Sequence, residues 1–298
     1  MAASPAPPIR YQSSDEDSGR WIGFPFRAGD IVISTRSKSG TTWMQMICAL
    51  LIFQTPDLPA PLRELSPWLD WLVNRKDEVW ARLEAQTHRR FIKTHTPLDG
   101  IPIVPEVTYI VVARHPLDMA VSLYHQGDNL DRARMRELAG LPPLPEQGPR
   151  PNLHDWLVQW IEADTRPEGD MDSLPGVMHH LSDAWARRNE PNVVLVHYDD
   201  LQADLDGQMR MLAARLGVEV DESMWPSLVK AATFDEMQSR ADDLTPDVGG
   251  IFKDRSRFFR TGKSGTASAL LSAEELDHYR ARLRAQCASE TMEWLHRD

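Results

Sequence analysis

The sequence predicts an α/β protein, in which a P-loop-like parallel sheet is flanked by helices on both faces. Three short apolar runs support this prediction, and a helix-forming segment follows each of them: residues 31–33, 109–113 and 193–196. An apolar run of this length between turn residues is typical of a strand buried in a parallel sheet. Because strands and helices alternate along the chain, right-handed crossovers would place the strands parallel.

The elements can be justified in chain order. The first strand, Ile31–Ile33, precedes a segment in which apolar residues recur with helical spacing from residue 43 to 51, and Pro56 ends that pattern. The second strand precedes a helix that begins at Pro116, a residue suited to a first helical turn. The third strand precedes a helix over residues 205–216, and Phe91-Ile92 adds a further short strand.

The chain has 298 residues, which we interpret as one domain over residues 21–298. Residues 1–20 are rich in Pro, Ser, Ala and acidic residues, so we expect a disordered N-terminal arm. Residues 127–176 interrupt the strand and helix rhythm with many prolines, and only 156–161 within them suggest a helix. We expect this insertion to be a mobile cover over the site; the alternative is a loop packed permanently on the domain.

Composition excludes several partners. The chain carries 33 Lys and Arg against 44 Asp and Glu, a formal charge of −11, which argues against nucleic acid and anionic lipid surfaces as partners. Only two cysteines are present and no secretory signal is visible, so a reducing cytoplasm is expected. The longest apolar run, residues 47–53, is too short to cross a bilayer, so no integral membrane contact is expected.

An anion-binding loop is predicted at Ser37-Lys38-Ser39-Gly40-Thr41-Thr42-Trp43, between the first strand and its helix. Unpaired N–H groups and the helix dipole attract an anion there, Gly40 allows close approach, and Lys38 adds a charge. An ordinary capped helix is the alternative. The loop differs from the nucleoside-triphosphate pattern, because its Lys precedes the Gly, and the second strand ends in Arg114-His115 without an acidic metal ligand. A site without metal is therefore expected.

Further motifs follow in order: Phe91 to Pro97 (F-I-K-T-H-T-P), Tyr109 to Ser122, Tyr198 after the third strand, Thr233 to Met237, and Phe258 to Gly262. Together with the loop, they resemble the cytosolic sulfotransferase family that uses 3′-phosphoadenosine 5′-phosphosulfate (PAPS). The resemblance spans residues 31 to about 266. It implies a sulfotransferase that forms adenosine 3′,5′-bisphosphate (PAP) as product, without a metal ion.

The resemblance also implies roles for single residues. Lys93 and His95 are two apart at a strand end, so both side chains leave on one face; alone, such a pair is more often surface decoration. Within the family pattern, His95 is the general base, and Lys38 and Lys93 hold the transferred group. The residues expected to bind PAPS or PAP are Lys38, Ser39, Gly40, Thr41, Thr42, Trp43, Arg114, Ser122, Tyr198, Thr233, Phe234, Met237, Phe259, Arg260, Thr261 and Gly262.

The chain departs from the family at its end, with Thr261 where a Lys is usual and with Gly262-Lys263-Ser264-Gly265-Thr266-Ala267 where the family often continues G-x-x-G-D-W. The dimer pattern of animal relatives is not recognisable, so a homodimer stays one option. Residues 56–59, 66–70 and 88–100 look most like actinobacterial glycolipid sulfotransferases. A glycolipid or other small hydroxyl acceptor is therefore expected, with a phenol as second choice. A metal-dependent nucleotide kinase and a PAPS-binding module without activity are the competing classes.

Trp68, Trp71 and Trp80 have two readings. They would suit a hydrophobic mouth for the acceptor, but their spacing also fits one core-facing helix.

Overall fold

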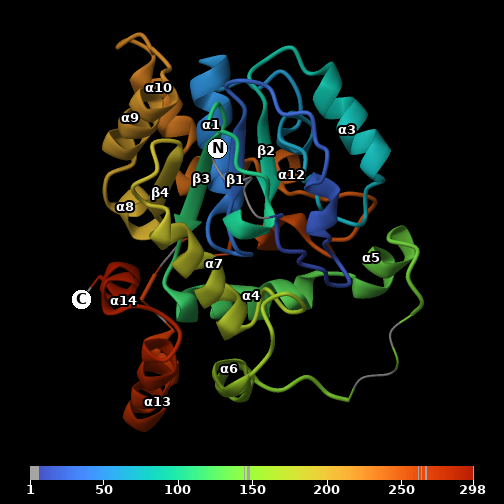
Figure 1. Ribbon diagram of the computed structural model, residues 1–298, viewed down its shortest axis with the longest axis vertical. Coiled ribbons are helices and arrows are strands. Elements are labelled where there is room, and N and C mark those ends of the chain that lie inside the picture. The colour runs from blue at the N-terminus through green and yellow to red at the C-terminus, as the bar shows by residue number, and fades with distance from the viewer. Residues whose placement is uncertain are drawn as a thin grey trace, which may run out of the picture.

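A four-stranded parallel sheet forms the centre of the molecule (Figure 1). The computed structural model describes residues 7–143, 145, 148–260, 262, 264–265 and 267–297. The strands are β1 (Ile31–Ser34), β2 (Phe91–Thr94), β3 (Thr108–Ala113) and β4 (Val193–His197), in the order β2-β1-β3-β4. Their register pairs Ile31 with Phe91 and with Thr108. The predicted parallel α/β fold is confirmed.

Helices cover both faces of the sheet because alternate strand residues are apolar on each side. Ile31 and Ile33 pack with α1, α9 and α10, whereas Val32 packs with α3 and α7 on the opposite face. The helices are α1 (Thr41–Phe53), α2 (Leu62–Leu65), α3 (Lys76–Ala85), α4 (Pro116–Asn129), α5 (Arg132–Leu138), α6 (Leu153–Glu162), α7 (Leu174–Ala186), α8 (Tyr198–Ala203), α9 (Leu205–Leu216), α10 (Trp225–Ala231), α11 (Phe234–Ser239), α12 (Ala241–Leu244), α13 (Ala273–Arg284) and α14 (Ser289–His296).

The segment 127–176 is more regular than its prolines suggest. It contains the end of α4, all of α5 and α6 and the start of α7, so the expectation of a single helix is wrong. Leu157 and Ile161 of α6 are buried in a second apolar core that α4, α7, α13 and α14 share. Figure 1 shows α6 below α4, whereas α5 lies to the right. The two helices therefore occupy different places, and α6 is part of the packed domain.

Residues 7–20 are packed on the domain, in contrast to the expected disordered arm, whose residues 1–6 lie outside the described part. Tyr11 is 1% exposed, and its hydroxyl donates a hydrogen bond to Asp99 over 2.9 Å. An antiparallel bridge pairs Glu16 with Trp71. Long-range backbone pairing and one buried aromatic ring thus hold a segment whose composition is polar.

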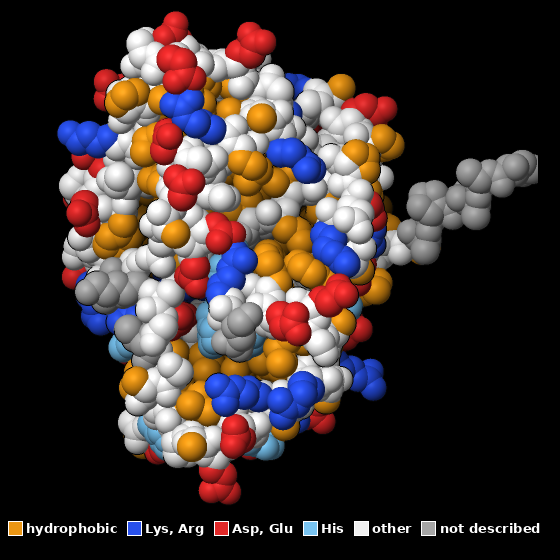
Figure 2. All heavy atoms as spheres, turned by 90° about the vertical axis from the view of Figure 1, so that its left-hand side faces the viewer, with side chains coloured by type: hydrophobic (Ala, Val, Ile, Leu, Met, Phe, Trp, Pro, Cys, Tyr) orange, Lys and Arg blue, Asp and Glu red, His pale blue; other side chains and the backbone are white. Residues whose placement is uncertain are grey.

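On the face that Figure 2 shows, acidic and basic side chains are interspersed around small apolar areas. Among the described residues, no helix has the length and apolar character needed to cross a membrane.

Candidate active site

The candidate site lies where the strands end. The loop after β1 leads into α1, His95 follows β2, Arg114 follows β3 and Tyr198 follows β4. Because neighbouring parallel strands end at the same edge of a sheet, these segments meet there, and ligands in α/β folds bind at this edge. A cavity is lined by residues from all four, together with residues from the segments 130–135 and 246–260 and with Gly262.

The backbone of the loop after β1 is shaped for close approach by a ligand. Gly40 is the N-cap of α1 with a φ of 103°, and a Cβ there would lie 3.1 Å from the ring of Tyr198. Lys38 also has a positive φ, 64°. Because no side chain caps α1, its first-turn N–H groups are left for a bound anion. Thr41 and Thr42 line the cavity, whereas Ser39 is buried outside the cavity wall.

Lys38 supplies a cation to this loop, and its ammonium lies 4.4 Å from the ring centre of Phe258. Burial lowers the pKa of Lys38 to about 7, and the nearby charges of Arg114, Lys93 and Arg260 act in the same direction. A cluster of like charges that shares one cavity attracts an anion strongly, because the anion relieves their mutual repulsion.

A second cationic position lies beside the loop. Arg114 is 7% exposed and donates a hydrogen bond to the carbonyl oxygen of Lys38 over 3.0 Å. Its guanidinium lies 4.4 Å from the ring centre of Tyr198. Ser122 of α4 and Arg260 line the same cavity. The cavity thus contains two cationic positions, and a ligand with two phosphate groups requires two.

Aromatic side chains line the cavity near the loop. The indole N–H of Trp43 donates to the carbonyl of Ala232 over 2.8 Å, and its ring meets that of Tyr198 edge-on. Phe234 and Phe259 pack edge-on with their centres 6.2 Å apart, and Phe234 fills the space beside Gly262. Flat rings of this kind suit a heterocyclic base. Further predicted residues that line the cavity are Met237, Arg260 and Gly262.

Two predicted donor residues do not reach the wall of this cavity as side chains. Thr233 caps α11: its hydroxyl accepts from the N–H of Glu236 and donates to the carbonyl of Lys230. Ser39 is buried within the loop. Thr261 lies outside the described residues.

His95 is 4% exposed and lines the cavity. Its Nδ1 is hydrogen-bonded to the carbonyl oxygen of Thr35. A carbonyl oxygen only accepts, so Nδ1 carries the hydrogen and Nε2 keeps its lone pair. Burial, Lys93 and Arg36 hold the pKa of His95 well below its usual range, so the ring is neutral at neutral pH. The side chain is therefore set to accept a proton at Nε2.

Two stacked tryptophans lie next to His95. The rings of Trp68 and Trp71 are 4.8 Å apart at their centres, and Trp68 meets His95 edge-on at 4.5 Å. The ammonium of Lys93 lies 3.9 Å from the ring centre of Trp68. Both tryptophans belong to the irregular segment between α2 and α3, so the expectation of one core-facing helix is wrong for them. They line the cavity, as the acceptor-mouth reading requires.

A buried carboxylate fixes this arrangement. Asp70 is 0% exposed and accepts hydrogen bonds from the indoles of Trp21 and Trp68, at 3.0 and 2.7 Å. It also accepts from the hydroxyls of Thr94 and Thr96, which flank His95 in the chain. Asp70 thus ties the tryptophan pair to the end of β2, a contact that sequence reasoning missed.

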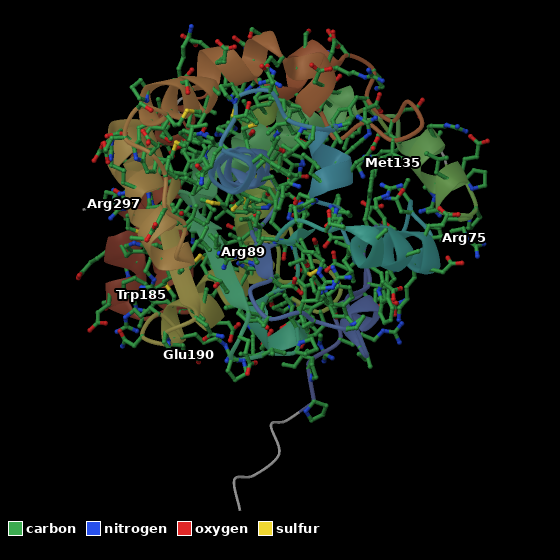
Figure 3. All side chains as sticks on the ribbon, turned by 90° about the horizontal axis from the view of Figure 1, so that it is seen from above. Arg75, Arg89, Met135, Trp185, Glu190 and Arg297 are labelled. Carbon is green, nitrogen blue, oxygen red and sulfur yellow. The ribbon has the colours of Figure 1, made fainter. Side chains whose placement is uncertain are left out.

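The rest of the cavity wall comes from outside the sheet. It is formed by Asp15 and Glu16, by Leu130, Arg132 and Met135, by Asp172, and by Ile251, Phe252 and Phe258. Figure 3 shows Met135 on α5, on the same side of the molecule as Arg75 at the start of α3 and away from Arg297. Glu16 was missed because its segment is polar; Tyr11 and Trp21 on either side were the signal that it is anchored.

The strand ends of this parallel sheet carry an anion-binding loop, two more cations and a buried neutral histidine. These features define a group-transfer protein of the α/β class. The comparison with known proteins agrees. The chain belongs to the sulfotransferase family, because the family profile described as "Sulfotransferase domain" matches residues 28–292.

Relatives support this membership, and a solved structure shares the fold. The chain is 39% identical to a glycolipid sulfotransferase of Mycobacterium bovis, over 97% of this chain and 94% of the relative. It is 25% identical to sulfotransferase 1A1 of Rattus norvegicus, over 94% and 92% of the two chains. Mouse sulfotransferase SULT7A1 complexed with PAP shares the fold with a TM-score of 0.69 and 21% identity, over 94% of this chain and 93% of that chain.

Proposed function

We propose that this protein transfers a sulfuryl group from PAPS to a hydroxyl group of an amphiphilic acceptor such as a glycolipid, with His95 as the general base. The observation that carries the proposal is the state of His95. It is a neutral imidazole with a fixed tautomer, and it shares one cavity with Lys38, Lys93 and the open end of α1.

The donor end of the cavity fits PAPS. The loop at Lys38 to Thr42 would receive the 5′-phosphosulfate, and Arg114 with Ser122 the 3′-phosphate. Trp43 and Phe234 would enclose the adenine ring. Gly40 suits this loop, because its positive φ is unfavourable for other residues and a Cβ there would press against the ring of Tyr198.

The chemical step needs one proton transfer and one displacement. PAPS supplies the sulfuryl group. His95 Nε2 accepts the proton of the acceptor hydroxyl as its oxygen forms a bond to sulfur. The bond between sulfur and the bridging phosphate oxygen breaks, and PAP departs with the electron pair. Lys38, Lys93 and the N–H groups of α1 stabilise the negative charge that gathers on that oxygen.

Electrostatics couples donor binding to the base. In the free cavity the pKa of His95 is low because the site is buried and cationic. A bound anionic donor opposes the cationic effect, since negative charge nearby favours the imidazolium. Donor binding therefore makes His95 a stronger base when the acceptor arrives.

The acceptor class rests on the relatives and on the cavity wall. The named function of the mycobacterial relatives is glycolipid sulfotransferase. The wall beyond His95 combines apolar side chains such as Met135 and Phe252 with the carboxyl groups of Glu16 and Asp172. An acceptor with an apolar part and a polar head would match both.

Three expectations stay predictions: a cytoplasmic location, a homodimer, and a reaction that needs no metal ion. Cys48 and Cys287 are free thiols, as a reducing compartment allows. Within the part of the chain that the structure describes, no group of three or more His, Cys, Asp or Glu side chains is placed to hold a metal.

The direct test incubates the protein with PAPS and a set of hydroxyl acceptors in the presence of a chelator. Mass spectrometry then searches for products heavier by one SO₃ group. Products with sugar or lipid alcohols support the proposal. Binding of PAP without any sulfated product would show a binding module instead, and activity that requires an added metal ion would contradict the mechanism.

The role of His95 is tested by His95→Ala. We expect kcat to fall by roughly 10²–10⁴-fold, as for the loss of a general base. PAP affinity should stay nearly unchanged, because His95 is expected to contact the acceptor and not PAP. Isothermal titration with PAP is the control for folding. A kcat near that of the wild type over the whole pH range would rule out His95 as the base.

A further inference from the structure

Among the side chains that line the cavity, those of Glu16 and Trp71 each hold a buried polar atom that has no hydrogen-bond partner in the described part of the chain. One is Glu16 Oε2, a hydrogen-bond acceptor when the carboxyl is ionised, and the other is the indole N–H of Trp71, a donor. Glu16 is 5% exposed and Trp71 is 4% exposed, and both line the cavity that contains His95. A buried polar group without a partner costs free energy, so each atom points to a ligand that satisfies it.

The backbone brings the two side chains together. The backbone N–H of Leu72 donates to the backbone carbonyl of Asp15 over 2.8 Å, and the backbone N–H of Asp17 donates to the backbone carbonyl of Asp70 over 2.9 Å. Glu16 and Trp71 are therefore the pair between these bonds, directly opposite each other across an antiparallel bridge. Pairs of this kind have the closest side chains in an antiparallel arrangement, and both side chains leave on the same face.

This pair lies close to the proposed base. Arg36 is 1% exposed, and one of its terminal nitrogens is 3.9 Å from Glu16 Oε2. The same nitrogen donates a hydrogen bond to the carbonyl of His95. Trp71 is stacked on Trp68, which meets the ring of His95. Arg36 thus links Glu16 to the backbone of His95, and Trp68 links Trp71 to its ring.

We propose that Glu16 and Trp71 form a subsite for a second hydroxyl group of the acceptor, so that the preferred acceptors carry neighbouring hydroxyls, as a sugar ring does. The inference rests on the proposed sulfuryl transfer and specifies its acceptor. One hydroxyl satisfies both atoms, because it accepts a hydrogen bond from the indole N–H and donates one to the carboxyl oxygen. The stacked tryptophans add a flat apolar surface for the C–H face of the ring.

The charge state of Glu16 suits a neutral partner. Burial raises the pKa of Glu16 to about 8; Arg36 opposes this effect, and Asp70, Asp172 and Asp15 reinforce it. Near neutral pH the carboxyl therefore holds a proton in most molecules, and it can donate as well as accept. A neutral polyhydroxy head fits such a group better than a cationic acceptor does.

The experiment compares octyl glucoside with 1-octanol, which has the same tail and one hydroxyl. The readout is kcat/KM for sulfated product by mass spectrometry, expressed as the ratio of the two acceptors. In the wild type the ratio should favour the glucoside strongly. Glu16→Leu and Trp71→Phe should each lower the ratio by about tenfold or more, because one partner of the second hydroxyl is lost. Glu16→Gln, which keeps an oxygen acceptor and a donor, should retain most of the ratio.

Matched controls separate this role from a structural one. Trp80→Phe removes another indole N–H without a partner, outside the cavity, and should leave the ratio unchanged. PAP affinity shows that each variant folds. If Glu16→Leu fails to bind PAP, the comparison of the acceptor ratio between Trp71→Phe and Trp80→Phe still tests the subsite. A ratio that Trp71→Phe leaves unchanged, or a wild type that sulfates both acceptors equally, overturns the subsite. A wild type that sulfates no hydroxyl acceptor contradicts the proposed function itself.

Discussion

Binding of PAP should be accompanied by proton uptake at Lys38. In the free protein the pKa of Lys38 is about 7, because the ammonium is buried near Arg114, Lys93 and Arg260. At pH 7.5 only about a quarter of the molecules would carry this charge. A phosphate group beside the amine favours the ammonium, so the bound state should be fully protonated. The expected uptake from Lys38 is then about 0.75 proton at pH 7.5 and nearly one at pH 8.5.

The sign of the pH dependence follows from this uptake. The complex holds more protons than the free protein, so PAP affinity should fall as the pH rises above the free pKa of Lys38. Between pH 7.5 and 8.5 the fall should be roughly eightfold, from the fraction of free protein that is already charged. The phosphate groups add little in this window, because their second pKa is near 6. Lys93, whose pKa burial lowers to about 8, would steepen the fall if it also contacts the ligand.

Isothermal titration in buffers of different ionisation enthalpy measures the uptake directly. The observed enthalpy should vary linearly with that of the buffer, with a slope equal to the number of protons bound. Lys38→Arg is the matched control, since a guanidinium stays charged at every pH used, and its slope should fall by the contribution of Lys38. A wild-type slope of zero at both pH values, or equal slopes for the two proteins, would refute the reasoning.

The remaining predictions concern other parts of the site. Arg114→Ala should lower PAP affinity by roughly 10–100-fold but spare AMP, which lacks the 3′-phosphate; an undiminished preference for PAP in titrations would contradict this. Asp70→Asn should destabilise the fold by about 1–3 kcal/mol in urea unfolding, because an amide N–H₂ would face the hydroxyl and indole donors that Asp70 now accepts from. Asp57→Asn, at an exposed position, should change stability little. Equal urea midpoints for the two variants would refute this prediction. A Gly/Ser linker in place of Arg132–Leu138 should raise the acceptor KM and the rate of acceptor-free PAPS hydrolysis several-fold, because this helix borders the cavity. PAP affinity should stay constant. An unchanged acceptor KM and hydrolysis rate would show that the helix does not cover the site.

The sheet could be predicted because its signal is local. Each strand is a short apolar run, and the residues that follow it, among them Lys38, His95 and Arg114, must lie at one edge once the strands are parallel. The loop and the helix after it follow from the same reasoning. Motif order along the chain was therefore sufficient to bring most of the predicted residues to one cavity, and their roles in donor binding stay predictions.

The acceptor end could not be predicted in the same way. Glu16 lies in a polar segment whose only local signals are Tyr11 and Trp21, and its burial depends on pairing with residues 55 positions later in the chain. Asp70 is an acidic residue among apolar ones, and its partners come from three separate segments. Long-range pairing of this kind leaves no periodic pattern in the sequence.

This division of the cavity has an evolutionary consequence. The donor end is built on strand ends and on the first turn of α1, where a substitution disturbs the sheet as well as the ligand. The acceptor wall is built from residues 15–16, 130–135 and 246–252, which lie outside the strands. Loops tolerate exchange better than buried strands do. Descendants of such a chain can therefore acquire new acceptors through substitutions in three short segments outside the strands, with less disturbance of the sheet than changes at the proposed donor end would cause.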